Sequence, residues 1–331
     1  MLKILCLTPA SGYRHTNIDD MGTHLMIWRA SALALALGLS LIPAQAVATS
    51  VEWVASEERA EERPAFYRVV QSVNLSLSDH VRALPTPQML QSDPHAARAN
   101  LRAWVAEGRV MVASQRRQLA DGYSEASLLP EQNAAALAQT EALVRFMDGL
   151  DILFDEFDHY SASTARLLQF EPWFVDAYYD SQQLVIRIGQ ELILAQARME
   201  PDPVVASSLR VFAYSADIQL ELARAGHNRA HASYLDAREM ADNFDRAAAD
   251  MAEALALAQA AIELAGNDEQ GWGDSLNYEA QILRETLSVA DDMRSRAGMS
   301  LAGRYQGLDR LVELYRNRPT RDMVFASSLV L

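Results

Sequence analysis

The 331-residue chain contains a single cysteine, Cys6, which lies in a segment that we expect to be removed. One cysteine cannot form an internal disulfide. Once Cys6 is gone, the mature chain has no thiolate ligand for zinc or an iron–sulfur cluster and no cysteine nucleophile. We therefore expect a cysteine-free mature protein that is held together by side-chain packing, and its length is sufficient for a sizeable core.

Basic residues are also scarce. Lysine and arginine together number 29, whereas aspartate and glutamate number 44, so the formal net charge is −15. A protein this acidic repels the phosphates of nucleic acids and of anionic lipids. No run of arginine or lysine overrides that repulsion locally, and we expect no nucleic-acid partner.

Several catalytic and nucleotide-binding motifs are absent from the sequence. It contains no Gly-x-Gly-x-x-Gly, no Gly-Lys-Ser/Thr phosphate loop, no Gly-x-Ser-x-Gly nucleophile turn and no His-Glu-x-x-His. No cofactor is indicated. The long helices that the apolar spacing predicts, described below, also lack the strand-end loops that usually carry catalytic groups. We therefore expect a protein that is not an enzyme.

The longest apolar run has the features of a signal peptide. Residues 30–42 are almost uniformly apolar, Arg29 precedes them, and small residues follow up to Ala46 and Ala48. A basic residue, a short apolar core and an Ala-x-Ala site together predict a secretory leader. The run is too short to be a membrane-spanning helix, which needs about 20 apolar residues. We expect cleavage after Ala46 or Ala48 and a periplasmic or secreted mature protein.

The true start of translation is open. The first 20 residues carry no helical pattern and would make the stretch before the apolar run unusually long, so Met21 and Met26 are alternatives to Met1. We leave residues 1–48 out of the fold as a leader with a possible mis-annotated extension. Beyond them no segment approaches the roughly 18 apolar residues of a membrane span, so we expect no transmembrane segment in the mature chain.

Apolar residues of the mature chain recur at helical spacing, with no sustained two-residue alternation. This pattern predicts an all-α protein, an elongated antiparallel helical bundle with coiled-coil-like seams and one or two lobes. We expect a first helical region at 49–200, a second at 201–318 and a C-terminal tail at 319–331. Proline and glycine signals divide the chain into about six helices, at 51–83, 94–121, 130–170, 172–199, 203–265 (one helix, or two joined at Gly226) and 275–316.

Four aromatic residues gather near the start of the fourth predicted helix, at Trp173, Phe174, Tyr178 and Tyr179. Rings at this spacing share a helix face and can line a pocket for a flat or cationic ligand. Core aromatics whose tyrosine hydroxyls reach the surface have the same spacing. The sequence leaves both interpretations open.

Two histidines, His227 and His231, stand four residues apart. In a helix they would share one face, a geometry that can chelate a divalent metal. The intervening residues lack the glutamate of a zinc protease motif. The alternative is a pair of solvated surface histidines.

An acidic stripe predicts a second possible metal site. Glu156 and His159 match one half of the carboxylate-bridged di-iron pattern of helical bundles, but no second Glu-x-x-His exists in the chain. The alternative is a solvated face opposite the apolar seam that runs from Leu143 to Phe157. The stripe consists of Asp148, Asp151, Asp155, Glu156, Asp158 and His159.

These features together favour an exported, non-enzymatic protein that acts through its helix faces. Its partner would be another envelope protein or a further copy of itself. The alternative is a periplasmic bundle that binds or senses a small molecule near the aromatic group or a metal at the histidines.

Overall fold

The computed structural model describes residues 65–124, 130–162, 167–200, 202–230, 237–266, 272–297 and 307–318. Nearly all residues in these ranges are helical and none forms a β-strand, so the all-α prediction is confirmed for them. They belong to one compact unit that runs from Val47 to Leu331. The predicted leader at 1–48 and the tail at 319–331 lie outside the described residues.

The first four described helices are α3 (Ala65–Arg82), α4 (Pro87–Ser92), α5 (Pro94–Ser124) and α6 (Pro130–Ser161). Asp93 starts α5 as the sequence predicts, because its Oδ1 accepts a 3.0 Å hydrogen bond from the backbone N–H of Ala96 while Pro94 occupies the first helical position. The remaining helices are α7 (Leu167–Met199), α8 (Pro203–Ala230), α9 (Ala237–Ala265), α10 (Trp272–Ser295) and α12 (Leu308–Arg316).

Helix α7 begins earlier than the sequence predicts. A restart was expected at Pro172, but α6 ends at Ser161 and α7 begins at Leu167, with Pro172 inside it. A proline in a helix interior removes one backbone hydrogen bond and costs about 3 kcal/mol. Burial of Phe170 and Phe174 on either side of it outweighs that cost, since each large apolar side chain contributes about 1.5–3 kcal/mol.

Two more predicted helices are each divided, so the described part holds more helices than the six expected. The segment 203–265 forms α8, which continues past Gly226 to Ala230, and α9, which begins at Ala237. Residues 231–236 lie outside the described ranges. Gly226 lies within α8, where an added Cβ would come 3.0 Å from the ring of Tyr179. The segment 275–316 forms α10 and α12, separated by residues outside the described ranges.

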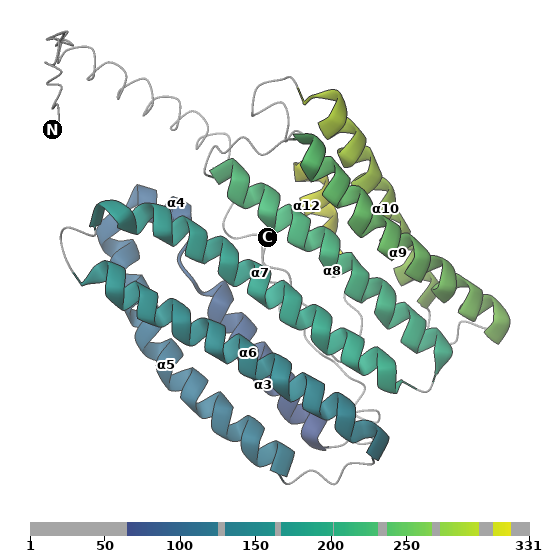
Figure 1. The fold of residues 1–331 in the computed structure, drawn as a ribbon, viewed down its shortest axis with the longest axis horizontal. Coiled ribbons are helices and arrows are strands. Elements are labelled where there is room, and N and C mark those ends of the chain that lie inside the picture. Colours follow the sequence, from purple (N-terminus) through teal and green to yellow (C-terminus); the bar gives the residue numbers. More distant parts are fainter. Residues whose placement is uncertain are drawn as a thin grey trace, which may run out of the picture. The chain divides into compact units, whose positions relative to one another are not determined.

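From α4 to α10 each helix packs against the next, and α3 packs mainly against α5 and α6, as expected for a helical bundle (Figure 1). Helix α7 lies between α6 and α8 and packs most extensively on these two. Arg145 pairs with Glu191, whereas Glu156 hydrogen-bonds Trp173, so later residues of α6 meet earlier residues of α7 and the two helices are antiparallel.

The apolar core consists mainly of two clusters of buried side chains. One extends from Phe66 to Ala213 and includes Trp272, and the other extends from Val211 to Tyr315. The predicted seam from Leu143 to Phe157 is buried within the first. Helix α8 contributes to both clusters, so the core is continuous across residue 201, where the sequence suggested a division.

Candidate functional site

Trp173 and Phe174 are core residues in the structure. The Trp173 ring stacks on Tyr160 at a centroid distance of 5.1 Å, and its Nε1–H donates a 3.0 Å hydrogen bond to Glu156 Oε2. Phe174 stacks on Phe170. The hollow that Trp173 and Phe174 line leaves no space for a water molecule. The structure therefore shows filled packing at these two rings, and ligand binding there stays a prediction.

Tyr178 and Tyr179 lie further along α7, on the side toward α8. Tyr179 stacks on the imidazole of His227, with centroids 5.3 Å apart, and meets Tyr178 edge-on. His227 Nε2 lies 2.7 Å from Asp176 Oδ1, so the last turn of α8 is tied to the first half of α7. Burial raises the pKa of Tyr179 to about 12, which keeps its hydroxyl protonated at neutral pH.

These contacts bring together residues that belong to separate candidate sites in the sequence. The end of α6 supplies Glu156, the start of α7 supplies Trp173 and Asp176, and the end of α8 supplies His227. Asp180 lies in the same electrostatic environment: burial raises its pKa, the charge of His227 lowers it, and the charges of Asp176 and Glu156 raise it further. The result is a polar seam between helices that has an acidic character.

Among the described residues, no group of three or more histidine, cysteine, aspartate or glutamate side chains is arranged to hold a metal ion. Glu156 is hydrogen-bonded to Trp173, and the His159 ring packs edge-on against Tyr160, with centroids 5.2 Å apart. His231 lies outside the described residues, so metal binding by the His227–His231 pair stays a prediction.

The acidic stripe of α6 faces arginines of α5. Arg109 pairs with Asp155 at 2.9 Å and with Asp158 at 2.8 Å. One heptad further along α5, Arg116 makes the same kind of double contact, with Asp148 at 2.7 Å and Asp151 at 2.8 Å. These acids are therefore ion-paired across a helix–helix seam, although they remain accessible to water.

Sequence reasoning missed these pairings, although their signal was present. Arg109 and Arg116 are seven residues apart, and the four aspartates follow one another at steps of three, four and three. Both sets therefore lie along one face of their helix. What the sequence could not supply was that α5 and α6 are neighbours in the right register.

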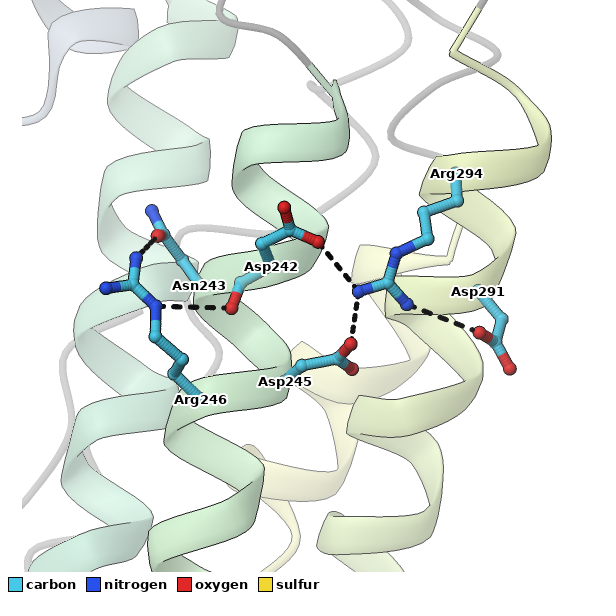
Figure 2. Close-up of polar contacts among 6 residues, drawn as sticks. All are labelled: Asp242, Asn243, Asp245, Arg246, Asp291 and Arg294. Carbon is cyan, nitrogen blue, oxygen red and sulfur yellow. Dashed lines mark hydrogen bonds and ion pairs between the residues drawn. The ribbon is translucent and has the colours of Figure 1, made fainter.

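A second charged group fixes the register of α9 against α10 (Figure 2). Arg294 pairs with Asp242 at 2.9 Å, with Asp245, and more loosely with Asp291 at 3.5 Å. The hydrogen bonds that the guanidinium donates to Asp245 and Asp242 raise its pKa. Arg246 points away from Arg294 in Figure 2 and hydrogen-bonds Asn243 on its own helix.

Helix α9 exposes large apolar side chains on the face that it turns away from the core. Leu257 is 55% exposed and Leu264 is 89% exposed. They are seven residues apart and therefore lie on one face, two turns from each other. Alanines at 249, 256 and 260 on the same side are exposed as well. Among the other described helices, α4, α5 and α10 each expose one large apolar residue, and the two on α6, Leu137 and Ile152, are 15 residues apart. Helix α9 therefore has the more continuous apolar surface.

Comparison with known proteins identifies no relative: no family, no curated protein and no solved structure matches the chain. None of the described helices combines sufficient length with sufficient apolar character to cross a bilayer.

Proposed function

We propose that this chain is an exported, non-enzymatic protein built as an antiparallel helical bundle, and that it acts by binding another polypeptide on the outward face of α9. The observation that carries the proposal is the exposure of Leu257 and Leu264 on a single face of that helix. The partner is either another envelope protein or a second copy of the chain.

The cost of leaving these two leucines in water supports a contact surface. Burying a leucine side chain contributes about 1.5–3 kcal/mol, so covering the exposed parts of both is worth on the order of 2–4 kcal/mol. Scattered single apolar residues are ordinary on protein surfaces, whereas contiguous apolar patches mark interaction sites. Leu257 and Leu264 are of the second kind, because exposed alanines connect them along α9.

The close packing of the interior favours a function through surface contacts over the binding of a ligand between the helices. The hollow beside Trp173 and Phe174 is filled to the point that water is excluded. A small-molecule site usually needs a cleft of about 300 Å³ or more. The shallow depression on α3 and α5, beside Val69 and Arg117, is open to solvent and lacks enclosing walls.

Export is the second part of the proposal, and it rests on the sequence. The apolar run at 30–42 and the small residues up to Ala46 and Ala48 have the order of a cleaved leader. Intact-mass measurement of protein recovered from the envelope or medium tests it directly. We expect a mature N-terminus at Val47 or Thr49, and an uncleaved chain retained in the cytosol would refute export.

Site-specific photocrosslinking tests the contact surface. A benzophenone amino acid is placed at Leu257 or at Leu264 in the full chain, and at Val110 on α5 as a control that is 73% exposed but lies outside α9. We expect one defined adduct from each α9 position, with another polypeptide or with a second copy, and none from Val110. Absence of adducts from α9, or equal adducts from all three positions, would overturn the proposal.

A further inference from the structure

The outward face of α9 carries charges of opposite sign at its two ends. We define the α9 outer face by eight exposed residues, which follow one another at helical spacing on the side away from the core. Arg246 lies toward its N-terminal end and Glu263 toward its C-terminal end, with Glu253 near the middle. The full set is Arg246, Ala249, Glu253, Ala256, Leu257, Ala260, Glu263 and Leu264.

From this arrangement we propose that the occupant of the α9 outer face is a second copy of the same chain, which docks with its own α9 antiparallel to the first. The inference rests on the proposed function and names the partner of that surface. In this pairing the local two-fold axis passes between residues 254 and 255, and Arg246 of each copy faces Glu263 of the other.

Charge decides the direction of pairing. Two parallel α9 helices in register would set Arg246 against Arg246, Glu253 against Glu253 and Glu263 against Glu263, and like charges in contact are destabilising. The antiparallel arrangement replaces the Arg246 and Glu263 clashes by two Arg246–Glu263 pairs. Glu253 lies opposite Ala256, but the two Glu253 side chains are as close to the axis as Ala256 and remain near each other, so one like-charge contact is left where the parallel arrangement has three. Arg246 has N–H groups left for such a pair, because its Nε–H donates to the carbonyl of Asp242 and one of its terminal nitrogens donates to Asn243.

Shape agrees with the same direction. With the axis between residues 254 and 255, Leu257 of one copy lies opposite Ala252 of the other, and Ala249 lies opposite Ala260. Near the axis a large side chain thus meets a small one, whereas Leu264 at the end of the face lies opposite Asp245. Alanines allow two helices to approach to the short end of the usual 8–10 Å range. A face whose halves complement each other under a two-fold rotation is the requirement for an isologous dimer.

The size of the face predicts a weak dimer. Residues 246–264 span about 27 Å at 1.5 Å per residue, and a helix is about 10–12 Å wide. One partner then buries on the order of 300 Å², well below the roughly 800 Å² per partner of a stable standard interface. We expect a reversible association with a Kd on the order of 10–100 μM.

Single-cysteine crosslinking distinguishes this geometry from others, and the chain suits it because Cys6 is its only cysteine. In a Cys6→Ser background, Ala256→Cys places two thiols about 4.5 Å apart along the paired helices, whereas Leu264→Cys places them about 28 Å apart. Under mild oxidation we expect Ala256→Cys to form a disulfide dimer and Leu264→Cys to stay monomeric. A mixture of Arg246→Cys and Glu263→Cys proteins should form the mixed dimer in preference to either homodimer.

Two results would overturn the inference. Equal self-crosslinking of Leu264→Cys and Ala256→Cys indicates a parallel or random encounter, and no crosslinking of any variant indicates no dimer on this face. If the latter occurs while photocrosslinkers on α9 still capture another polypeptide, the proposed function stands and only the second copy is wrong. If neither the cysteine variants nor the photocrosslinkers on α9 give an adduct, both the proposed function and the dimer are refuted.

A charge swap provides a readout that does not depend on thiols. Arg246→Glu should weaken the association at least fivefold in sedimentation experiments, and the double variant Arg246→Glu/Glu263→Arg should restore it. All of these residues are exposed, so far-ultraviolet circular dichroism and the melting temperature should not change. Failure of the double variant to recover would contradict the Arg246–Glu263 pairing.

Discussion

Removal of the Arg318 side chain tests how the last described helix, α12, is held to the rest of the protein. Arg318 follows α12, and its Nε lies 2.5 Å from Glu279 Oε1 on α10. The Glu279 side chain is only 1% exposed and that of Arg318 is 12% exposed. The guanidinium also lies 4.6 Å from the ring centroid of Phe212 on α8. One side chain thus joins the end of α12 to two other helices.

The magnitude follows from the burial of Glu279. When one partner of a buried ion pair is deleted, the remaining charge has neither water nor a counterion, and such deletions cost about 3–5 kcal/mol. We expect Arg318→Met to lower the free energy of unfolding by that amount at neutral pH. The double variant Glu279→Gln/Arg318→Met should be within about 1–2 kcal/mol of the wild type, because it leaves no unpaired charge while glutamine can still bond Ser215.

The cost should depend on pH in a definite direction. Burial raises the pKa of Glu279 and the Arg318 charge pulls it down, so loss of Arg318 raises this pKa further. A carboxyl whose pKa is higher in the folded than in the unfolded chain favours folding when protonated, and that contribution is lost as pH rises through the folded pKa. Arg318→Met should therefore be less destabilising at about pH 5 than at about pH 8.

Urea unfolding followed by circular dichroism measures these differences. Wild type, Arg318→Met and the double variant are compared at both pH values under matched salt. A cost below about 1 kcal/mol at neutral pH, or one that is the same at both pH values, would show that Glu279 is hydrated and that the buried-pair reasoning is wrong.

Three further predictions concern packing and charge. Gly108→Ala should destabilise the protein by about 1–3 kcal/mol, because the new Cβ would lie 2.3 Å from Phe154 Cζ. Gly149→Ala should be near neutral, because its Cβ would meet only the flexible tip of a leucine side chain. Chemical denaturation measures the free energy of unfolding of both variants. Burial lowers the pKa of His80 from 6.5 to about 4, so the free energy of unfolding should fall by about 1–2 kcal/mol as pH drops from 6.5 toward 4, after allowance for partial exposure. In urea titrations His80→Phe should lose this pH dependence. The same pH dependence in the variant and the wild type would contradict the prediction. Arg294→Met should lower the free energy of unfolding by less than about 1 kcal/mol relative to wild type, because the aspartates that pair with Arg294 are exposed. High salt should reduce this difference between variant and wild type.

Helix content and the starts of α5, α6 and α8 could be predicted from the sequence because they depend on local signals. Asp202 caps α8 with a 2.8 Å bond from the Val204 N–H, just as the Asp-Pro spacing indicates. Pro172 misled the prediction, because its local penalty is outweighed by burial of rings that only tertiary packing provides. Local signals thus failed where the core decided the helix boundary.

The candidate sites were less predictable than the fold. The contact between Asp176 and His227 joins residues 51 positions apart, and nothing in the sequence indicates that these two meet. On α9 the difficulty was different: residues 254–265 are apolar almost all round, so periodicity could not separate the buried face from the exposed one. Only the packing of α8 and α10 against α9 shows that Leu257 and Leu264 are on the outside.

Sedimentation equilibrium of the leaderless protein tests most directly the central claim that α9 is the contact surface between two copies of the chain. Wild type and Leu257→Glu/Leu264→Glu are measured from about 1 to about 200 μM, a range that brackets the expected Kd. We predict that the average mass of the wild type rises from monomer toward dimer and that the variant remains monomeric with unchanged helix content. Identical mass profiles for the two proteins would contradict the account.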